Sequence, residues 1–445
     1  MIILMKTLQV ILALGILILI HEFGHFFFAK IFGIRVDKFF LFFDAGGFKL
    51  FSTKSKWFTK LCPKAAEWET EYGIGWLPFG GYCKICGMID ESMDTEQMKS
   101  EPQPWEFRTK PAWQRLFVMA GGVLFNFILA IIVYICILGT WGEAYLSNEG
   151  KQIYVNELAS ELGFRNGDHI ISFDDYQPKD FGMLQADLAR EMAQKATVLR
   201  GTDTVDLYID QAKIGDVLQS PGMFSLALPF VVDSIPESSV NYESDLAKGD
   251  RIIAVSGTAT KFVQDAWPIL ENYAGSTAEV TLVRGADTLV QSLQVDTVGR
   301  LGVFLTQPEL SIKEYTALSA IPAGFKKTFT TIGGYIKDLK LVFTPKTEAY
   351  KSVGSFISIG QIFPATWDWY RFLSILALLS IMLGVMNLIP IPALDGGHIL
   401  FTLYEIITRR KPSDKFLEVT QIIGMILIFG LMILAFGNDI FKLFR

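Results

Sequence analysis

The most informative stretch of the chain is the apolar run LQVILALGILILI, residues 8–20, which leads directly into HEFGH, residues 21–25. Ionisable residues at membrane depth are costly and are usually functional. At helical spacing, residues four apart share a face, so His21 and His25 can present two imidazoles to one ion at about 2.0–2.1 Å. Glu22 would lie beside that ion and could take a proton from a water whose pKa zinc lowers from about 15.7 to about 7. The stretch predicts a zinc site inside a membrane helix, with the chemistry of peptide-bond hydrolysis.

The same residues have a plainer interpretation, in which a polar helix end is wetted by the membrane interface. The chain contains only 4 histidines, and two of them, His21 and His25, lie in a segment that should exclude them. Because such residues are expensive at membrane depth, this concentration favours metal binding over chance.

The composition indicates an integral membrane protein with a soluble part. The chain has 445 residues, of which 51% are hydrophobic and 19% are charged, and its mean hydropathy is +0.34. A bilayer span takes roughly 20 apolar residues, and four stretches come close to that length: residues 2–31, 113–138, 371–388 and 419–436. The first resembles a signal peptide, but no small-residue cleavage site follows it, so we interpret it as a retained span. A formal net charge of -6 argues against nucleic acid as a partner.

The charges between the spans predict the orientation. Residues 34–114 and the short connection 409–415 are rich in Lys and Arg, and connections of this kind stay in the cytoplasm. The long segment between the second and third spans should then be periplasmic, and the zinc site should lie toward the cytoplasmic leaflet. The prediction is a multi-pass protein of a bacterial inner (cytoplasmic) membrane.

None of the four cysteines falls in the outer segment, which therefore needs no disulfides. Cys83 and Cys86 have zinc-knuckle spacing. A closed structural site wants a second pair of ligands nearby, and only Cys62 is loosely available. We interpret these three residues as reduced cysteines of a cytoplasmic hairpin.

The outer segment contains a repeat. The sequence FRNGDHIISFD, residues 164–174, is echoed by AKGDRIIAV, residues 247–255, so a Gly-Asp turn between β-prone runs occurs twice. Each copy follows a short apolar strand pattern, and the pair resembles the circularly permuted PDZ domains of bacterial proteases. PDZ folds bind extended peptides by adding them as a strand to a sheet edge. We interpret His169, in the first copy, as a surface residue.

A catalytic zinc needs a third protein ligand, with one position left for water. The best candidate is Asp395 in NLIPIPALDGGH, residues 387–398, directly after the third apolar span. The prolines end the helix, and Gly396 and Gly397 permit the tight backbone that turns a carboxylate inward. Asn387 could donate to a developing oxyanion. His398 is the rival ligand.

Taken together, these motifs resemble the site-2 protease family of zinc metalloproteases, in particular its bacterial regulator of sigma-E protease type, and the resemblance covers the chain nearly end to end. It implies that His21, His25 and Asp395 bind Zn2+ and that Glu22 is the catalytic base. It also implies an intramembrane endopeptidase that cuts transmembrane segments of single-span proteins, such as anti-sigma factors and remnant signal peptides. Such cleavage normally follows a first cut outside the membrane.

The sequence YGIGWLPFGGY, residues 72–82, resembles the family's cytoplasmic β-hairpin, which dips into the membrane beside the zinc. A substrate helix hides its amides in internal hydrogen bonds and must be unwound before attack, and pairing to a strand edge replaces those bonds. The residues predicted for this pairing are Gly73, Ile74, Gly75, Gly80, Gly81 and Tyr82.

The chain departs from the family pattern in two places. Residues 120–126 match a family motif of the second span, but Gly122 stands where proline is usual. Residues 44–68 form an expanded stretch that contains several lysines. Lysines near a membrane favour anionic lipid, so we interpret this stretch as an extra cytoplasmic membrane-surface element.

The predicted fold is a polytopic α-helical membrane protein with about four transmembrane helices and two inserted PDZ-like α+β domains. Membrane helices are expected at 1–33, 113–140, 366–397 (with the LDG motif) and 419–445; a hairpin or membrane-associated region at 34–112; PDZ-like domains at 143–222 and 223–305; an amphipathic linker at 306–365; and a cytoplasmic connection at 398–418. Residues 311–342 could lie on the outer membrane surface or pack against the PDZ pair.

The expected partners are transmembrane protein substrates, the lipid bilayer, and peptide C-termini or extended segments at the PDZ-like domains. A different class of protein also fits part of the pattern: a catalytically silent PDZ scaffold with structural zinc. A metal-ion transporter fits less well, because transport paths usually need several polar residues along the spans.

Overall fold

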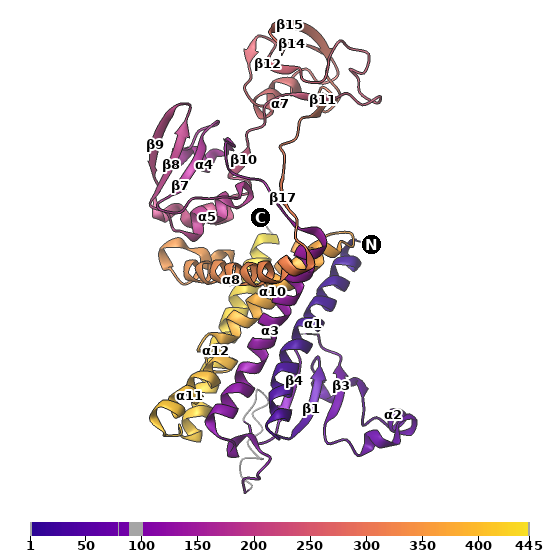
Figure 1. Cartoon of the computed structure of the whole chain (residues 1–445), viewed down its shortest axis with the longest axis vertical. Helices are drawn as coiled ribbons and strands as arrows, with labels where there is room; N and C mark the ends of the chain where they lie inside the picture. The colour runs from indigo at the N-terminus through magenta and orange to yellow at the C-terminus, as the bar shows by residue number, and fades with distance from the viewer. Residues whose placement is uncertain (1, 79, 89–100, 444–445) are drawn as a thin grey trace. The chain divides into compact units, whose positions relative to one another are not determined.

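The computed structural model describes residues 2–78, 80–88 and 101–443. It divides the chain into two units, shown in Figure 1. Unit 1 comprises Met1–Gly142, Glu314–Leu339 and Lys351–Arg445, and unit 2 comprises Glu143–Lys313 and Lys340–Tyr350. Unit 2 is therefore an insertion between the second and third apolar helices.

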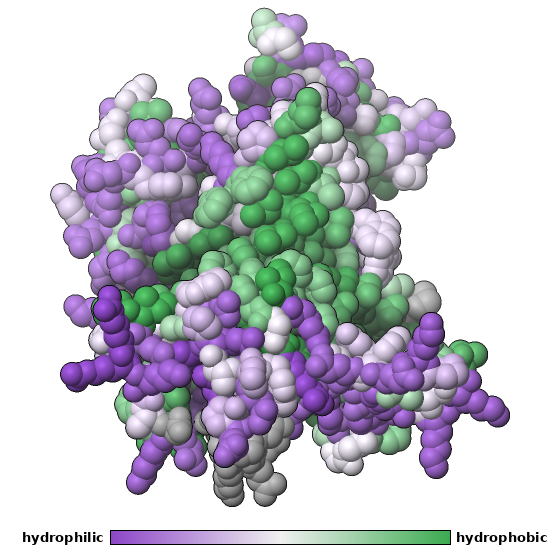
Figure 2. Space-filling model, turned by 60° about the horizontal axis from the view of Figure 1, so that its bottom comes forward, coloured by the Kyte–Doolittle hydropathy of each residue, from purple (hydrophilic) through white to green (hydrophobic). Residues whose placement is uncertain are grey.

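Among the described residues, unit 1 has four helices long and apolar enough to cross a membrane, in agreement with the four predicted spans. They are α1 (Ile2–Ile31), α3 (Ala112–Trp141), α10 (Trp369–Leu388) and α12 (Asp414–Leu443). The other helices of this unit are α2 (Lys56–Leu61), α8 (Ala317–Val342), α9 (Phe356–Ile362) and α11 (Asp395–Thr408). Figure 2 shows an apolar surface that is bordered along its lower edge by polar residues, as expected of a bilayer-facing surface.

Helix α3 is the centre of the membrane bundle, and α1, α10 and α11 all pack on it. Helices α1 and α3 approach most closely at Gly24 and Gly121, where a Cβ on Gly24 would lie only 2.2 Å from the Gly121 carbonyl oxygen. Small residues permit such backbone contact between membrane helices. In the core, Leu17, Tyr134 and Phe372 from three different helices pack together.

The expected amphipathic region at 306–365 contains two helices, α8 and α9. Ile332, Tyr335 and Leu339 of α8 pack against the core of the membrane bundle. Other apolar side chains of the same helix, including Phe325 and Phe329, remain exposed. An amphipathic helix is thus present, as the sequence pattern indicated.

The predicted hairpin after α1 is in fact a four-stranded mixed sheet. Its strands are β1 (Val36–Leu41), β2 (Lys49–Ser52), β3 (Glu71–Gly75) and β4 (Tyr82–Ile85), in the order β2-β3-β1-β4. β1 runs parallel to β3 and antiparallel to β4. β1 lies between β3 and β4, which therefore do not pair with each other, and the expanded stretch supplies β2 on the other side of β3 together with α2.

A second difference concerns residues 366–418. The zinc motif does not continue the third span, because α10 ends at Leu388 and Asp395 begins the separate helix α11. Residues 398–408, expected to be a connection, are part of this helix. At 14 residues α11 is too short to cross a bilayer, and for that reason hydropathy alone does not predict it.

Unit 2 contains two small domains, each with its own apolar core. The first is built from β6 (Ile153–Val155), α4 (Glu157–Glu161), β7 (His169–Phe173), α5 (Leu184–Arg190), β8 (Lys195–Arg200), β9 (Asp203–Tyr208), α6 (Ile214–Gln219) and β10 (Phe224–Leu226). The second is built from β11 (Val232–Ser234), β12 (Arg251–Val255), β13 (Thr258–Ala259), α7 (Val263–Glu271), β14 (Thr277–Arg284), β15 (Asp287–Gln294) and β16 (Phe304–Leu305). Two further strands, β5 (Glu143–Tyr145) and β17 (Ser311–Lys313), pair with each other at the two ends of the insertion.

The boundary between the two domains lies later than the expected residue 223, because β10 pairs with β6 of the first domain.

The Gly-Asp repeat has the same structure in both domains. In the first, Arg200 from β8 makes two hydrogen bonds of 2.9 Å to the buried carboxylate of Asp168. In the second, Arg284 from β14 makes two of 2.8 Å to the buried carboxylate of Asp250. A two-pronged guanidinium–carboxylate pair of this kind is strong and directional. The repeat therefore fixes a turn to a neighbouring strand in each domain.

Candidate metal centre

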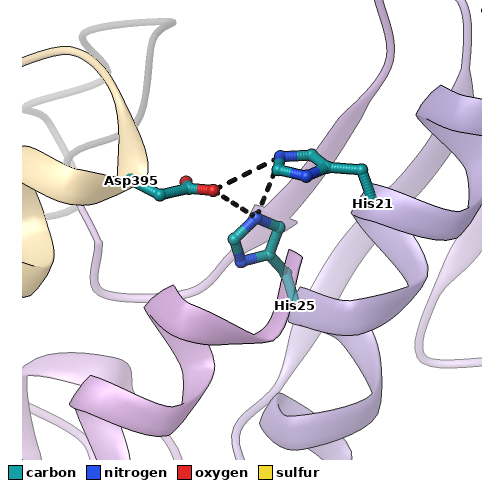
Figure 3. A group of neighbouring side chains, drawn as sticks. All are labelled: His21, His25 and Asp395. Atoms are coloured by element: carbon teal, nitrogen blue, oxygen red, sulfur yellow. Dashed lines mark hydrogen bonds and ion pairs between the residues drawn. The ribbon is translucent and has the colours of Figure 1, made fainter. Parts of the chain in front are cut away.

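His21, His25 and Asp395 come together in unit 1, as Figure 3 shows. Asp395 Oδ2 lies 3.4 Å from His21 Nε2 and 3.4 Å from His25 Nε2. The two imidazole nitrogens are also 3.4 Å apart. Three potential ligand atoms therefore form an equilateral triangle, although Asp395 is 370 positions from His25 in the sequence.

This triangle has the dimensions of one face of a zinc coordination sphere. In a tetrahedron with ligands about 2.0–2.1 Å from the metal, the ligand atoms are about 3.3–3.4 Å from one another. Asp395 Oδ2 is buried and, within the described part of the chain, has no hydrogen-bond partner. A buried carboxylate oxygen without a partner is costly unless a cation neutralises it. The residues present fit a zinc ion with its fourth position open.

Helix α3 provides the partners of both histidine rings. His25 Nδ1 lies 2.8 Å from the Val118 carbonyl oxygen, which can only accept a hydrogen bond. His25 Nδ1 is therefore the protonated nitrogen, and the lone pair of Nε2 points into the triangle. A metal-binding histidine usually donates its second ring N–H in this way, which fixes the tautomer and the ring orientation.

The partner of His21 is the side chain of Asn126. Asn126 Nδ2 lies 3.1 Å from His21 Nδ1, while Asn126 Oδ1 is buried without a partner in the described structure. Amide oxygen and nitrogen are assigned from the hydrogen-bond network, and a half-turn of this amide places Oδ1 against Nδ1. His21 Nδ1–H would then donate to Asn126, leaving Nε2 free to bind metal as in His25.

Asp395 is held in place by α11, a helix that is itself fixed at both of its ends. At its first turn the preceding loop folds back so closely that a Cβ on Gly396 would lie 2.2 Å from the Ile389 carbonyl oxygen, which explains the glycine. At its last turn Glu405 Oε1 accepts a hydrogen bond of 2.6 Å from Arg115 Nη2 on α3. Both side chains of this ion pair are nearly buried. The ion pair fixes α11 to the same helix that orients the two histidines.

A cavity of about 560 Å³ opens on the triangle and is also lined by Glu22. Glu22 is half-buried on α1, and its Cγ lies next to Gly81 in the loop before β4. Residues Tyr82–Ile85 of β4 form a further wall of this cavity. The carboxylate that the sequence suggested as a base thus shares one space with the proposed ligands.

Asn387 and His398 take different positions around the triangle. Asn387 Nδ2 lies 3.3 Å from His21 Nε2, so this amide points at the triangle from the end of α10. His398 lines the cavity but does not belong to the close group of ligand atoms within the described residues. The geometry therefore favours Asp395 over His398 as the third ligand.

The prediction for the substrate-pairing strand needs correction. Gly73 and Ile74 lie in β3, which pairs with β1 on one side and with β2 on the other, so neither residue has a free edge. Gly75 also pairs with β2. The expanded stretch contributes β2 and covers the edge that a simple hairpin would expose.

Strand β4 is the edge that meets the cavity. It pairs with β1 and is the last strand in the order of the sheet, within the part of the chain that the structure describes. Tyr82 belongs to this strand, and Gly80 and Gly81 directly precede it. Gly81 and Tyr82 line the cavity, while the pairing of these three residues with substrate stays a prediction.

The cysteines do not form a second metal site with other ligands among the described residues. Within the described structure, Cys62, Cys83 and Cys86 form no disulfide. Burial, together with a hydrogen bond to Asp37, raises the pKa of Cys86 to about 12. A thiol with so high a pKa is a poor nucleophile, which agrees with a structural role.

The chain was compared with known proteins. The model of peptidase family M50 matches residues 9–431. Regulator of sigma-E protease RseP of Escherichia coli K12 is 28% identical over 461 residues, which cover 97% of this chain and 98% of that protein. A protein of Xylella fastidiosa whose name proposes a zinc metalloprotease is 28% identical over 97% of both chains. The chain therefore belongs to peptidase family M50, and it is a membrane-embedded zinc metalloprotease of the site-2 type.

Proposed function

We propose that the protein is an intramembrane endopeptidase that hydrolyses peptide bonds within transmembrane segments of single-span proteins. The observation that carries this proposal is the 3.4 Å triangle of His21, His25 and Asp395, in which both histidines belong to α1, a helix long and apolar enough to span a bilayer. A protease site at this position is suited to bonds that lie within the membrane. Anti-sigma factors and remnant signal peptides, which the family resemblance implies, are the proposed substrates; the Escherichia coli relative is named regulator of sigma-E protease.

His21, His25 and Asp395 would hold the zinc, and Glu22 would act as general base and acid. When bound, zinc supplies a Lewis acid that polarises the scissile carbonyl and makes water acidic enough to attack at neutral pH. Glu22 accepts a proton as water oxygen adds to the carbonyl carbon. It then gives that proton to the nitrogen as the C–N bond breaks, so the products are a carboxylic acid and an amine.

Two further parts of the cavity would position the substrate. The Asn387 amide, which points at the triangle, would donate to the oxygen that gains negative charge. Strand β4, whose residues including Tyr82 line the cavity, would pair with the unwound substrate strand and replace its lost helical hydrogen bonds. Gly80 and Gly81 would bring the backbone close to that strand.

The two small domains of unit 2 would be PDZ-like and would select substrates outside the membrane. The repeated buried Asp–Arg pair and the strand–helix–strand order of both domains support a common fold. The Lys- and Arg-rich connections support a cytoplasmic position for the sheet and for residues 409–415. The two domains would then lie in the periplasm.

The proposal is tested by comparing membrane peptides in cells that produce either the natural protein or Glu22→Gln. Mass spectrometry should find single-span fragments that accumulate only in the variant, because glutamine cannot accept the proton. Purified Glu22→Gln should retain natural zinc content, since Glu22 is not one of the proposed ligands. The matched control is Asp395→Ala, which should lose both zinc and cleavage. Ordinary cleavage by zinc-loaded Glu22→Gln would refute the general-base role.

A further inference from the structure

The expanded stretch forms a separate arm, residues 49–68, that takes no part in the proposed chemistry. It consists of β2, α2 and a short turn that ends before Glu69. The arm contains five lysines and one glutamate, a net charge of 5 − 1 = +4 in a chain whose net charge is -6. None of its residues lines the cavity around the metal centre. The arm is thus a cationic element within an acidic protein.

The arm is ordered by its own contacts. The ring of Phe58 lies 5.3 Å from that of Phe51 and 6.5 Å from that of Trp68. Lys54 Nζ donates to the carbonyl oxygens of Ala66, at 2.9 Å, and Trp68. One apolar face of α2 is therefore already used to hold the arm together.

A second apolar face of α2 points outward. Trp57 and Leu61, four residues apart, share a face and are 59% and 76% exposed. Lys56 and Lys60 are also four residues apart and lie on the adjoining stripe, where both are exposed. A helix with a tryptophan and a leucine beside a row of lysines has the pattern of an element that lies in a membrane interface.

The root of the arm lies at the end of a membrane span. Glu69 accepts a hydrogen bond of 2.8 Å from Lys30, which is in the last turn of α1. Tyr72, just beyond the arm, packs its ring against Phe26 of the same helix. Figure 1 shows α2 projecting sideways from this end of α1. The arm therefore starts at the level where tryptophan and lysine are both favoured, the border between lipid tails and headgroups.

We propose that this arm binds the anionic headgroups of the membrane leaflet beside it. Trp57 and Leu61 enter the boundary of the hydrocarbon, while Lys56, Lys60 and Lys64 contact lipid phosphates. An acidic peptide would satisfy the lysines equally well. It would not explain why the two apolar side chains are exposed at the level of the interface, and so lipid is the occupant that accounts for both features.

The test uses the full-length protein in nanodiscs, with an environment-sensitive fluorophore at the exposed position Ala66→Cys and the four native cysteines replaced by serine. Nitroxide-labelled lipid quenches the fluorophore if the arm lies on the bilayer. Quenching should be at least about twofold greater with phosphatidylglycerol present than in phosphatidylcholine alone, and salt should reduce it. The zinc content of every variant shows whether the rest of the molecule is intact.

Two sets of variants separate the arm's lysines from charge in general. Replacing Lys56, Lys60 and Lys64 by glutamine should abolish the extra quenching by phosphatidylglycerol. The matched control replaces Arg410, Lys411 and Lys415 by glutamine, which removes the same charge from another exposed connection and should leave the quenching unchanged. Weak quenching in both lipids would overturn the proposal, and so would quenching that does not respond to the arm's lysines.

Discussion

At the scale of single residues, Asn126 is the side chain on which the orientation of His21 depends. It is fully buried in α3, its amide touches His21 Nδ1, and its oxygen has no other partner in the described structure. If Asn126 accepts the Nδ1 proton, it keeps the metal-binding nitrogen of His21 unprotonated. Loss of such a supporting contact typically costs about 10–100-fold in metal affinity.

Asn126→Leu should therefore weaken zinc binding by about 10–100-fold. Asn126→Asp, whose carboxylate can only accept, should keep the natural affinity or raise it. Competition with a chelator of known affinity measures the difference without relying on activity. Ser380→Ala is the control, because Ser380 donates to the main-chain carbonyl oxygen of Asn126 and is not one of the proposed ligands. Equal affinities in the Leu and Asp variants would show that Asn126 does not set the tautomer.

The proposed ligands could be predicted from the sequence, whereas their supporting residues could not. The spacing of His21 and His25 places them on one face of any helix, and Asp395 follows from the chemistry of a third ligand. The contact between Asn126 and His21 spans 105 positions and depends on how α3 packs against α1. A polar residue within an apolar span was the available signal, since such residues are rarely placed there without a partner.

At the scale of elements, α11 acts as a short rigid support for Asp395. The ion pair between Arg115 and Glu405 joins its last turn to α3, with side chains only 12% and 13% exposed. Removing one partner of a pair this buried leaves an uncompensated charge and costs about 3–5 kcal/mol, whereas removing both is often nearly neutral.

Arg115→Met and Glu405→Met should each lower thermal stability and zinc occupancy, and the double variant should recover much of both. A double-mutant cycle on the midpoint of thermal unfolding measures the coupling between the two side chains. Lys411→Met is a suitable comparison, because Lys411 is an exposed cation near the same end of α11. Additive losses in the double variant would mean that the pair does not hold the helix.

The buried pair of the second small domain predicts a dependence on pH. Hydrogen bonds from Arg284 hold the pKa of Asp250 below its usual value of about 3.9. A lowered folded-state pKa stabilises the domain above the ordinary pKa, and this stabilisation is lost as pH falls through the lowered value.

Arg284→Gln should therefore speed amide exchange in β12 and β14 at neutral pH. The difference from the natural protein should begin to shrink as pH falls below about 4, and should disappear only after pH has fallen through the lowered pKa of Asp250 in the natural protein. Hydrogen–deuterium exchange with mass spectrometry resolves these strands. The first small domain, which keeps its own pair of Asp168 and Arg200, is the internal control. A difference that persists at low pH would point to lost packing of the arginine rather than lost charge pairing.

The elements that sequence reasoning missed share a physical cause. Hydropathy identifies α1, α3, α10 and α12, because a bilayer demands long apolar helices. It does not identify α11, whose 14 residues are stabilised by packing on α3. Nor does a pattern of glycines reveal that β3 is covered on both sides, since strand pairing between β1 and β3 depends on residues 33 positions apart.

At the scale of the whole molecule, unit 1 contains every proposed catalytic and metal-binding residue, and unit 2 is an insertion. The two tasks proposed for the protein, hydrolysis and selection of substrates, are thus assigned to different parts of the chain. The second small domain can be removed without cutting into the first. Its two ends lie together, because the Thr306 amide donates to the Val231 carbonyl oxygen at 3.0 Å.

Replacing residues 228–305 by a flexible linker of about ten Gly and Ser residues should leave zinc affinity unchanged, since such a linker spans roughly 16–19 Å and imposes little strain. If the domain selects substrates, the excised form should cleave a broader set of membrane proteins than the natural form. For each form, the cleaved proteins are those whose membrane fragments accumulate when Glu22→Gln is introduced. Quantitative mass spectrometry of membrane peptides compares the two sets. A control variant that keeps the domain and carries the same linker inserted after Thr306 accounts for the effect of added length. Unchanged zinc affinity with an unchanged set of cleaved proteins would remove the second domain from substrate selection, while lost zinc affinity would show that the catalytic unit depends on the insertion for its fold.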